Sequence, residues 1–484
     1  MAFAALATAG CSPPPQAATP PPAPAAPTDL GRALAAKVGV DGIYPHLRKF
    51  ADIAAANKGT RADNTPGYQA SVDYVANFLR DKGFDVQTPE YVRLIPGPPG
   101  NPMVEVAGRK LSVVQASLLA STPAGGLTGP TLHAAKPAGC APADYGPLDF
   151  RGKIAVTDDT TCSVVDKQNA ALARGASALL VVSAPGANGS PRGLFGPGYY
   201  EHLTTPVAVI SREVDTALLR TNVPVKLTLD AKNSSVKSRN VLAQTKTGDQ
   251  HNVVMAGAHL DSAPDAAGIN DAATGVAALL ETAAALGGSP NAANAVRFTF
   301  WGSGAAGQEG AIKYVRALPG DPLNDIALYL DFDILGSPNA GFFTFDGAQS
   351  GQPNPDVPLS LVPPGSAAIE RTLAGYVSLA GMKPASMPLS LGTDYGPFLN
   401  AGIPIGGLST GSSQRKNPLQ ARLWGGQAGA AFDPGSGVTV DALNRGAIAV
   451  MGPTVAFAVG TYAQSITGPN GVPPRDQRHR VPGK

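Results

Sequence analysis

The chain has 484 residues, with 37 lysines and arginines against 35 aspartates and glutamates, and only 15% of its residues are charged. A net charge of +2 spread so thinly argues against a nucleic-acid partner or a broadly acidic one. The length is sufficient for two or three domains with an ample core.

The first residues, MAFAALATAGC, form a short apolar run that ends in small residues and Cys11. This pattern is typical of a bacterial lipoprotein signal (1–11), in which Cys11 becomes the lipidated first residue. Residues 12–28 are rich in proline and alanine and predict a disordered tether between membrane and domain. An Ala-rich disordered leader with a chance cysteine is the alternative. We therefore expect an exported protein, anchored to the membrane through lipid at Cys11 or secreted.

The rest of the chain divides into three segments and a tail. Residues 29–107 show helical periodicity, then an amphipathic helix and an edge strand. Residues 108–236 carry short β runs around one helix, and residues 237–465 alternate strands with helices. The pattern predicts an α/β domain, with a mostly parallel or mixed sheet between helices, that is split by an inserted β-rich domain. Residues 466–484 are predicted to be a disordered tail.

Two cysteines, Cys140 and Cys162, lie in the predicted insert. In an exported protein, an isolated pair of this kind is most simply explained as one disulfide. Two buried thiols are the alternative.

A candidate metal site lies within the segment GAHLDSAPDAAGINDAATGVAALLE. His259 and Asp261 are two residues apart at the end of an apolar run, so their side chains point the same way from the tip of a strand. Asp271 follows a glycine-containing loop and opens an Ala/Leu-rich helix. A histidine, an aspartate about ten residues later and a helix start commonly build a metal site at the carboxyl edge of a parallel sheet.

These motifs occur in the same order as in the secreted and lipoprotein dizinc aminopeptidases, which the chain resembles over nearly all of residues 29–465. Relatives of this family include glutamate carboxypeptidase and the transferrin receptor. The insert, with GCAPADYGPLDFRGKIAV and PVAVISR, resembles the protease-associated domain that such enzymes often carry. The resemblance implies zinc-dependent removal of N-terminal residues from peptides or proteins. It also implies an insert that gates the cleft, with a passive β-rich appendage as the alternative.

The resemblance assigns zinc-binding roles to His259, Asp271 and Asp333, the last in the motif LDFDILGSPN. Asp271 matches the aspartate that bridges the two zinc ions of the family. Asp261 matches the carboxylate that orients the metal-binding histidine. One imidazole and two carboxylates leave an open position for water, as a catalytic zinc ion requires.

The next motif departs from the family. Its members have a Trp-Gly pair followed, after one residue, by two adjacent glutamates: the general base and a ligand of the second zinc. Here the stretch reads WGSGAAGQEGAIKYV, which places Gly304 and Ala305 at those positions. Neither side chain accepts a proton or binds a metal. Glu309 is the nearby carboxylate that would have to substitute as base, and an exposed glutamate on a helix surface is the alternative.

The last motif departs as well. In the secreted members, WGGxAGxAFDP leads into a Cys-Tyr-His segment, which supplies an oxyanion-stabilising tyrosine and a histidine ligand of the second zinc. Gly435, Ser436 and Gly437 stand at those three positions. Other members place this histidine in a Ser-Asp-His motif, where the chain reads GTDYGPF, with Tyr395. None of the six histidines falls between positions 260 and 478, so we expect one zinc ion where the family has two.

These losses lead to a specific hypothesis. The chain is an exported protein of the metallo-aminopeptidase family whose turnover is weak or lost, and its partners are peptides or protein N-termini. The alternative is a non-catalytic, peptide-binding or scaffold lipoprotein on the same fold. A third hypothesis, a serine hydrolase, comes from the motif GLSTG around Ser409. A catalytic triad would then need His479, the only histidine that follows Ser409.

Overall fold

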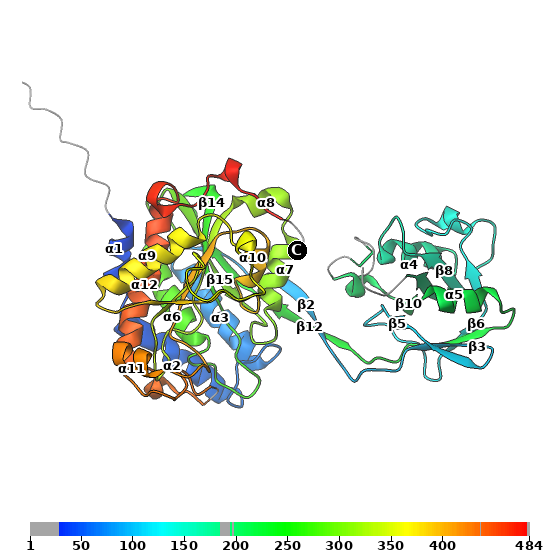
Figure 1. The fold of residues 1–484 in the computed structure, drawn as a ribbon, viewed down its shortest axis with the longest axis horizontal. Coiled ribbons are helices and arrows are strands. Elements are labelled where there is room, and N and C mark those ends of the chain that lie inside the picture. Colours follow the sequence, from blue (N-terminus) through cyan, green and yellow to red (C-terminus); the bar gives the residue numbers. More distant parts are fainter. Residues whose placement is uncertain (1–28, 184–193, 196–197, 436, 482–484) are drawn as a thin grey trace, which may run out of the picture.

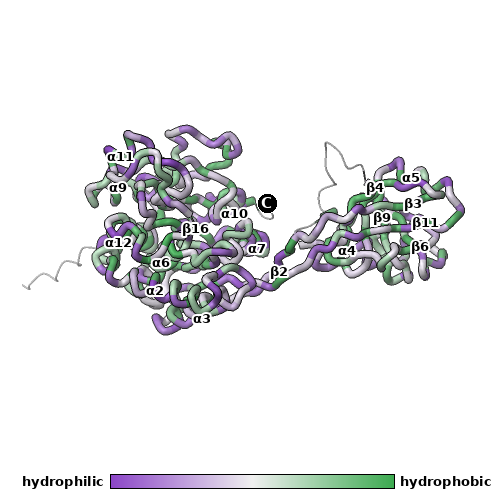
Figure 2. The backbone as a smooth tube through the Cα atoms, turned by 90° about the horizontal axis from the view of Figure 1, so that it is seen from below, coloured by the Kyte–Doolittle hydropathy of each residue, from purple (hydrophilic) through white to green (hydrophobic). Residues whose placement is uncertain are grey.

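The computed structural model describes residues 29–183, 194–195, 198–435 and 437–481. The predicted signal, the tether, Cys11 and Ser436 lie outside these residues. Two bodies make up the molecule: a larger one formed by both ends of the chain and a smaller one formed by its middle (Figure 1). Seen from below, the two bodies again lie apart and are joined at β2 (Figure 2).

The larger body is built on one mixed eight-stranded sheet in the order β1-β13-β15-β14-β16-β19-β17-β18. Its four central strands, β15, β14, β16 and β19, run parallel, whereas β13 and β17 pair antiparallel with β15 and β19. This arrangement confirms the predicted α/β class. The strands are β1 (Asp85–Gln87), β13 (Val241–Gln244), β14 (Asp249–His259), β15 (Asn294–Trp301), β16 (Ile326–Asp331), β17 (Phe343–Phe345), β18 (Ala385–Met387) and β19 (Ile405–Ser409).

Helices cover both faces of this sheet, because its central strands are apolar on both sides. Along β14, Val254 and Ala256 belong to one core cluster, and Val253 and Met255 belong to the other. The first cluster takes in α2 (Val40–Ala56), α3 (Pro66–Asp81), α6 (Ala273–Leu286), α9 (Ser366–Leu379) and α12 (Arg445–Gln464). The second takes in α7 (Glu309–Ala317), α8 (Gly320–Asp325) and α10 (Gly396–Asn400).

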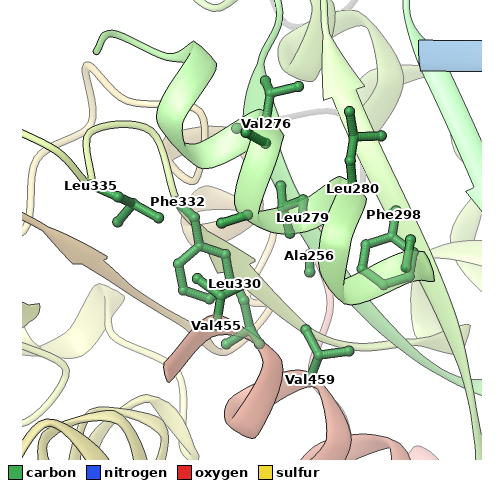
Figure 3. Close-up of a cluster of buried hydrophobic side chains, with 14 of the residues drawn as sticks. Ala256, Val276, Leu279, Leu280, Phe298, Leu330, Phe332, Leu335, Val455 and Val459 are labelled. Carbon is green, nitrogen blue, oxygen red and sulfur yellow. The ribbon is translucent and has the colours of Figure 1, made fainter. Parts of the chain in front are cut away.

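The first cluster forms the main core. Val276, Leu279 and Leu280 of α6 pack against the sheet, and Val455 and Val459 of α12 lie beside them (Figure 3). By length and composition α12 could cross a membrane, but 67% of its most apolar window is buried inside the protein. Its apolar character is therefore explained by its central place in the core. The remaining helices of the larger body are α1 (Leu30–Ala35), which packs on α12, and α11 (Pro418–Trp424).

The smaller body contains a five-stranded sheet, β5-β10-β9-β8-β7, and a four-stranded sheet, β4-β3-β11-β6. Apolar residues of both sheets form one core cluster, and a second cluster lies against α4 (Val164–Ala173). A disulfide joins Cys140 to Cys162. The strands are β3 (Met103–Val106), β4 (Arg109–Ser112), β5 (Val114–Gln115), β6 (Leu127–Gly129), β7 (Thr131–His133), β8 (Ile154–Asp158), β9 (Ala178–Val182), β10 (Val207–Ile210) and β11 (Val225–Thr228); the second helix is α5 (Arg212–Leu219).

The insert begins earlier in the structure than the boundary that the sequence predicts at residue 108. Strand β3 pairs with β4 and β11, so residues 103–106 belong to the sheet of the insert. The change in composition near 108 coincides with the β3–β4 hairpin turn, where Ala107 and Gly108 both have positive φ (49° and 79°). The composition therefore changes at a turn inside the insert, and the insert itself begins before that turn.

A two-stranded antiparallel ribbon, β2 (Glu90–Ile95) with β12 (Ser234–Arg239), connects the two bodies. At its base the buried Asp63 carboxylate accepts hydrogen bonds from Arg93 of β2 at 2.9 Å and from Ser238 of β12 at 2.6 Å. It also accepts one from Ser303, in the loop after β15, at 2.7 Å. Asp63 therefore ties both strands of the ribbon to a loop of the larger body.

The bodies also meet at one ion pair away from the ribbon. The Lys313 ammonium of α7 lies 2.7 Å from a carboxylate oxygen of Glu201 in η2 (Tyr199–His202). The same nitrogen lies 3.3 Å from the Tyr200 hydroxyl and 5.4 Å from the centre of its ring. The contact joins a helix beside the sheet's carboxyl edge to the insert.

The prediction of a disordered tail is wrong for residues 466–481. Ile466 and Val472 are buried in the main core. Arg478 donates to the backbone carbonyls of His251 at 3.1 Å and Asn324 at 2.6 Å. Arg480 donates to the carbonyl of Ile326, the first residue of β16, at 2.7 Å. The tail therefore crosses the amino ends of β14 and β16.

The polar composition of this tail concealed its order, because arginine–carbonyl hydrogen bonds rather than a long apolar stretch hold it in place. Burial lowers the pKa of the Arg478 guanidinium to about 10 and that of Arg480 to about 9. These side chains are anchored in the protein interior rather than extended into water.

We expect Arg478→Ala to lower the free energy of unfolding by about 1–3 kcal/mol, because two backbone carbonyls lose their charged donor. Urea unfolding followed by circular dichroism measures this change. Arg422→Ala, at an exposed position in α11, is the matched control and should leave the midpoint unchanged. A midpoint for Arg478→Ala equal to that of the control would show that the tail does not stabilise the sheet.

Candidate functional site

The candidate site lies at the carboxyl edge of the parallel strands. β14 ends at His259, β15 at Trp301, β16 at Asp331 and β19 at Ser409, so the segments after these four strands emerge together. Open α/β sheets bind ligands at this edge. A pocket of about 360 Å³ lies here and is lined by His259, Asp271, Ala305 and Asp433 among others. The predicted site residues His259 and Asp271 thus lie at the edge of the sheet where this pocket opens.

His259 is hydrogen-bonded through both ring nitrogens. Nδ1 lies 2.9 Å from the backbone carbonyl of Asp261, and Nε2 lies 2.8 Å from a carboxylate oxygen of Asp271. Burial by itself lowers the pKa of His259, but the charge of Asp333 and the contacts with Asp261 and Asp271 outweigh it and hold the pKa well above its usual value. Oxygen atoms on both sides of the ring therefore fix its orientation.

The Asp261 side chain faces the loop after β15 more than it faces the His259 ring. Its carboxylate accepts the backbone N–H of Gly304 at 2.7 Å and that of Ala305 at 3.2 Å. The nearer carboxylate oxygen is 3.7 Å from His259 Nδ1, farther than the backbone carbonyl of Asp261. Asp261 thus holds the ring through its main chain and the loop through its side chain.

The loop lies directly against His259 at Gly304. A β-carbon at position 304 would lie 2.5 Å from Cγ of His259 and closer still to its Cβ, nearer than real β-carbons approach other atoms. Only glycine fits here without moving the loop or the histidine. The next residue, Ala305, presents a methyl group to the pocket. At position 304, the first of the two expected glutamates, the His259 side chain therefore leaves no room for a side chain. At position 305, the second, the alanine side chain has no atom that could bind a metal.

The other positions predicted from the sequence lie farther from the pocket or carry no donor. Glu309 opens α7 and is not among the described residues that line the pocket. Tyr395 is buried, with its hydroxyl accepting the backbone N–H of Ser390 at 2.8 Å and its ring packed on Phe345. Gly435 lines the pocket without a side chain, and Gly437 likewise carries none.

The serine hydrolase hypothesis fails on geometry. Ser409 is the last residue of β19, and its Oγ accepts the backbone N–H of Gly411 at 3.0 Å. His479 lies in the tail, next to Gly402, just before the amino end of the same strand. The serine and the histidine thus lie at opposite ends of β19 and cannot form a hydrogen-bonded pair.

Asp333 lies within a group of carboxylates that sequence reasoning missed. One of its oxygens accepts the backbone N–H of His259 at 3.1 Å. One oxygen each of Asp331, Asp333 and Asp394 lies within 4.8 Å of the others. Burial, reinforced by neighbouring carboxylates, raises the pKa of Asp333 to about 6. The spacing of Asp331 and Asp333 in LDFD was a usable signal, because residues two apart leave a strand on the same side.

The donor set at His259 suits one zinc ion. An imidazole nitrogen and carboxylate oxygens are usual zinc ligands, and the Nδ1 bond to the Asp261 carbonyl leaves Nε2 directed at the Asp271 carboxylate. Two of the three predicted ligands therefore already converge. Ala305 and Gly437 offer no donor atom for a second ion.

Two protein-family models match the sequence of this chain. The model of peptidase family M28 matches residues 240–434, and the PA domain model matches residues 127–218. A probable lipoprotein aminopeptidase, LpqL, of Mycobacterium tuberculosis is 45% identical over 463 residues, covering 93% of this chain and 90% of its own. An aminopeptidase of Pseudomonas aeruginosa PAO1 is 35% identical over 422 residues, covering 84% and 76%.

Among solved structures, a zinc aminopeptidase from Bacillus subtilis aligns with a TM-score of 0.48 and 19% identity, covering 90% of this chain and 98% of its own. An aminopeptidase from Aneurinibacillus sp. strain AM-1 gives a TM-score of 0.47 and 19% identity, covering 90% and 96%. The sequence relatives extend over nearly the whole chain, and the two family models fall on the two bodies. The chain therefore belongs to peptidase family M28 and carries an inserted PA domain.

Proposed function

We propose that this protein is an exported, lipid-anchored member of the M28 family that binds peptide N-termini at a single zinc ion and has weak or no peptidase turnover. The zinc ligands are His259, Asp271 and Asp333, and the lipid is carried by Cys11. Family membership supports zinc and peptides, and the lipoprotein name of the M. tuberculosis relative supports the anchor. The missing donors at Ala305 and Gly437 support a single ion.

The observation that carries the proposal is the contact between Gly304 and His259. A missing glutamate alone would leave a gap that another carboxylate or an ordered water could fill. Here the loop has closed on the histidine, and Asp261 fixes it there through two backbone N–H groups. General-base catalysis typically contributes roughly 10²–10⁴-fold in rate, and this chain has no carboxylate at the base position to supply it.

The residues of the pocket can still bind zinc and the amino end of a peptide. When bound, zinc supplies Lewis-acid attraction for an oxygen or nitrogen of the ligand. The hydrogen bond from His259 to the Asp261 carbonyl orients Nε2 toward the ion, and Asp271 adds negative charge where a peptide ammonium would lie. The pocket also has apolar walls, formed by Ala266, Ile269 and Val438. These walls would exclude water from around a small side chain of the bound peptide.

Turnover is the first test. We expect the purified protein, supplied with zinc, to cleave Leu- and Lys-p-nitroanilide no faster than its His259→Ala variant, because both proteins have Gly304 in place of the catalytic glutamate. A binding measurement on the same samples, using fluorescence anisotropy of a labelled peptide, should show tighter binding by the unmodified protein. The P. aeruginosa aminopeptidase serves as the positive control. Chelator-sensitive cleavage well above the His259→Ala rate would refute the loss of turnover.

Restoring the glutamates is the second test. We expect Gly304→Glu with Ala305→Glu to remain without substantial activity and to lose stability, because the new β-carbon at 304 collides with His259. Gly304→Ala alone should lower the free energy of unfolding by about 1–3 kcal/mol through overpacking. Ala305→Glu, at an exposed position, should be tolerated and is the matched control. A gain of about 100-fold or more in hydrolysis by the double variant, at unchanged stability, would contradict the steric argument.

Zinc content is the third test. We expect about one zinc ion per chain by elemental analysis after loading and desalting, and its loss in Asp271→Asn, which removes a charged ligand. Asp433→Asn, which changes a carboxylate of the same pocket outside the proposed ligand set, should retain the ion. A second zinc ion that Asp271→Asn loses together with the first would overturn the single-site proposal.

A further inference from the structure

Asp331, Asp333 and Asp394 form a carboxylate cluster behind His259. Asp331 ends β16, Asp333 follows two residues later, and Asp394 lies just before α10. One oxygen from each lies within 4.8 Å of the other two. Asp331 and Asp394 are each 1% exposed, whereas Asp333 is partly exposed and faces the side of His259. The cluster therefore has two buried members and one that is partly exposed.

Three of the six carboxylate oxygens in this cluster are buried without a hydrogen-bond partner among the described residues. Both oxygens of Asp394 and Oδ2 of Asp331 accept no hydrogen bond from the described residues. Oδ1 of Asp331 accepts one from the Tyr329 hydroxyl at 3.1 Å, and Asp333 accepts the backbone N–H of His259. A buried carboxylate is normally paired or hydrogen-bonded, and a ligand in contact with Asp394 would satisfy its two unpartnered oxygens.

The neighbouring charges do not neutralise the cluster. The cation whose charge reaches all three carboxylates is His259, which is already hydrogen-bonded to Asp271 and to the Asp261 carbonyl. Tyr329 donates one hydrogen bond, and Trp301 Nε1 donates to the Tyr329 hydroxyl in turn. None of the three aspartates forms an ion pair with a lysine or arginine among the residues that the structure describes.

We propose that Asp331, Asp333 and Asp394 bind a hard divalent cation, such as Mn²⁺, Mg²⁺ or Ca²⁺, at a site separate from that of zinc. Three carboxylate oxygens without imidazole or thiolate are the donors that such ions prefer. Asp333 has two oxygens and is shared by the two sites, with His259 and Asp271 on one side and Asp331 and Asp394 on the other. The role of Asp333 toward zinc rests on the proposed function; the cation site does not.

Manganese is the probe, because binding removes the electron paramagnetic resonance signal of the free ion. We expect the zinc-loaded protein to bind one Mn²⁺ per chain. Asp394→Asn should weaken this binding at least tenfold while zinc content stays unchanged, because the amide keeps the shape of the side chain but removes its charge. Asp271→Asn, which changes the zinc site alone, should keep Mn²⁺ binding within about twofold and is the matched control.

Thermal unfolding gives a second measurement that does not depend on the spectroscopic signal. In chelator, Asp394→Asn should have a Tm no lower than that of the unmodified protein, because the amide replaces a buried carboxyl group that has no hydrogen-bond partner among the described residues. Added Mn²⁺ should raise Tm of the unmodified protein and leave Asp394→Asn unchanged. Equal Tm values with and without millimolar Mn²⁺ in the unmodified protein would overturn the proposal, and so would loss of Mn²⁺ in Asp271→Asn but not in Asp394→Asn. Neither result bears on turnover, which the nitroanilide assay decides.

Discussion

The buried Asp261 carboxylate is the constraint on which the arrangement of the cleft depends. It follows β14 and accepts two backbone N–H groups from the loop after β15, while its own carbonyl holds the His259 ring. Hydrogen bonds to a charged acceptor are stronger than neutral ones, so the loop is fixed against the histidine. The close approach of Gly304 to His259 follows from these bonds, as does the lack of room for a β-carbon at position 304.

The same edge of the sheet carries more negative charge than one zinc ion needs. Asp271 faces the pocket, Asp333 lies behind His259, and Asp331 with Asp394 lies deeper still. In a dizinc peptidase a second cation would share the task of neutralising such a group. Here Ala305 and Gly437 stand where the family resemblance places ligands of that ion, whereas Asp331 and Asp394 are buried at this edge. Together with Asp333, they are the described carboxyl groups whose oxygens lie close enough to one another to share a cation.

The sequence predicted the α/β sheet and the insert, because strand periodicity and changes in composition are local features; it also predicted that His259 and Asp271 lie together, and the structure brings them into contact. The order of the tail was missed because Arg478 and Arg480 contact carbonyls that are distant in the chain. Asp394 was passed over within GTDYGPF because its proximity to Asp331 and Asp333 exists only after β16 and α10 have packed. Gly304 was identified as a missing base, but its contact with His259 is a tertiary fact that no local pattern contains.

The Asp63 carboxylate joins the base of the PA-domain ribbon to the loop of the candidate site. Asp63 accepts hydrogen bonds from both strands of the ribbon and from Ser303, and the next residue along the chain is Gly304. The residue that anchors the ribbon and the residue that touches His259 are therefore neighbours in the chain. Coupling between the orientation of the insert and the position of this loop would be reciprocal: an occupant of the cleft that displaced the loop would shift the insert by the same free energy with which the insert shifts the loop.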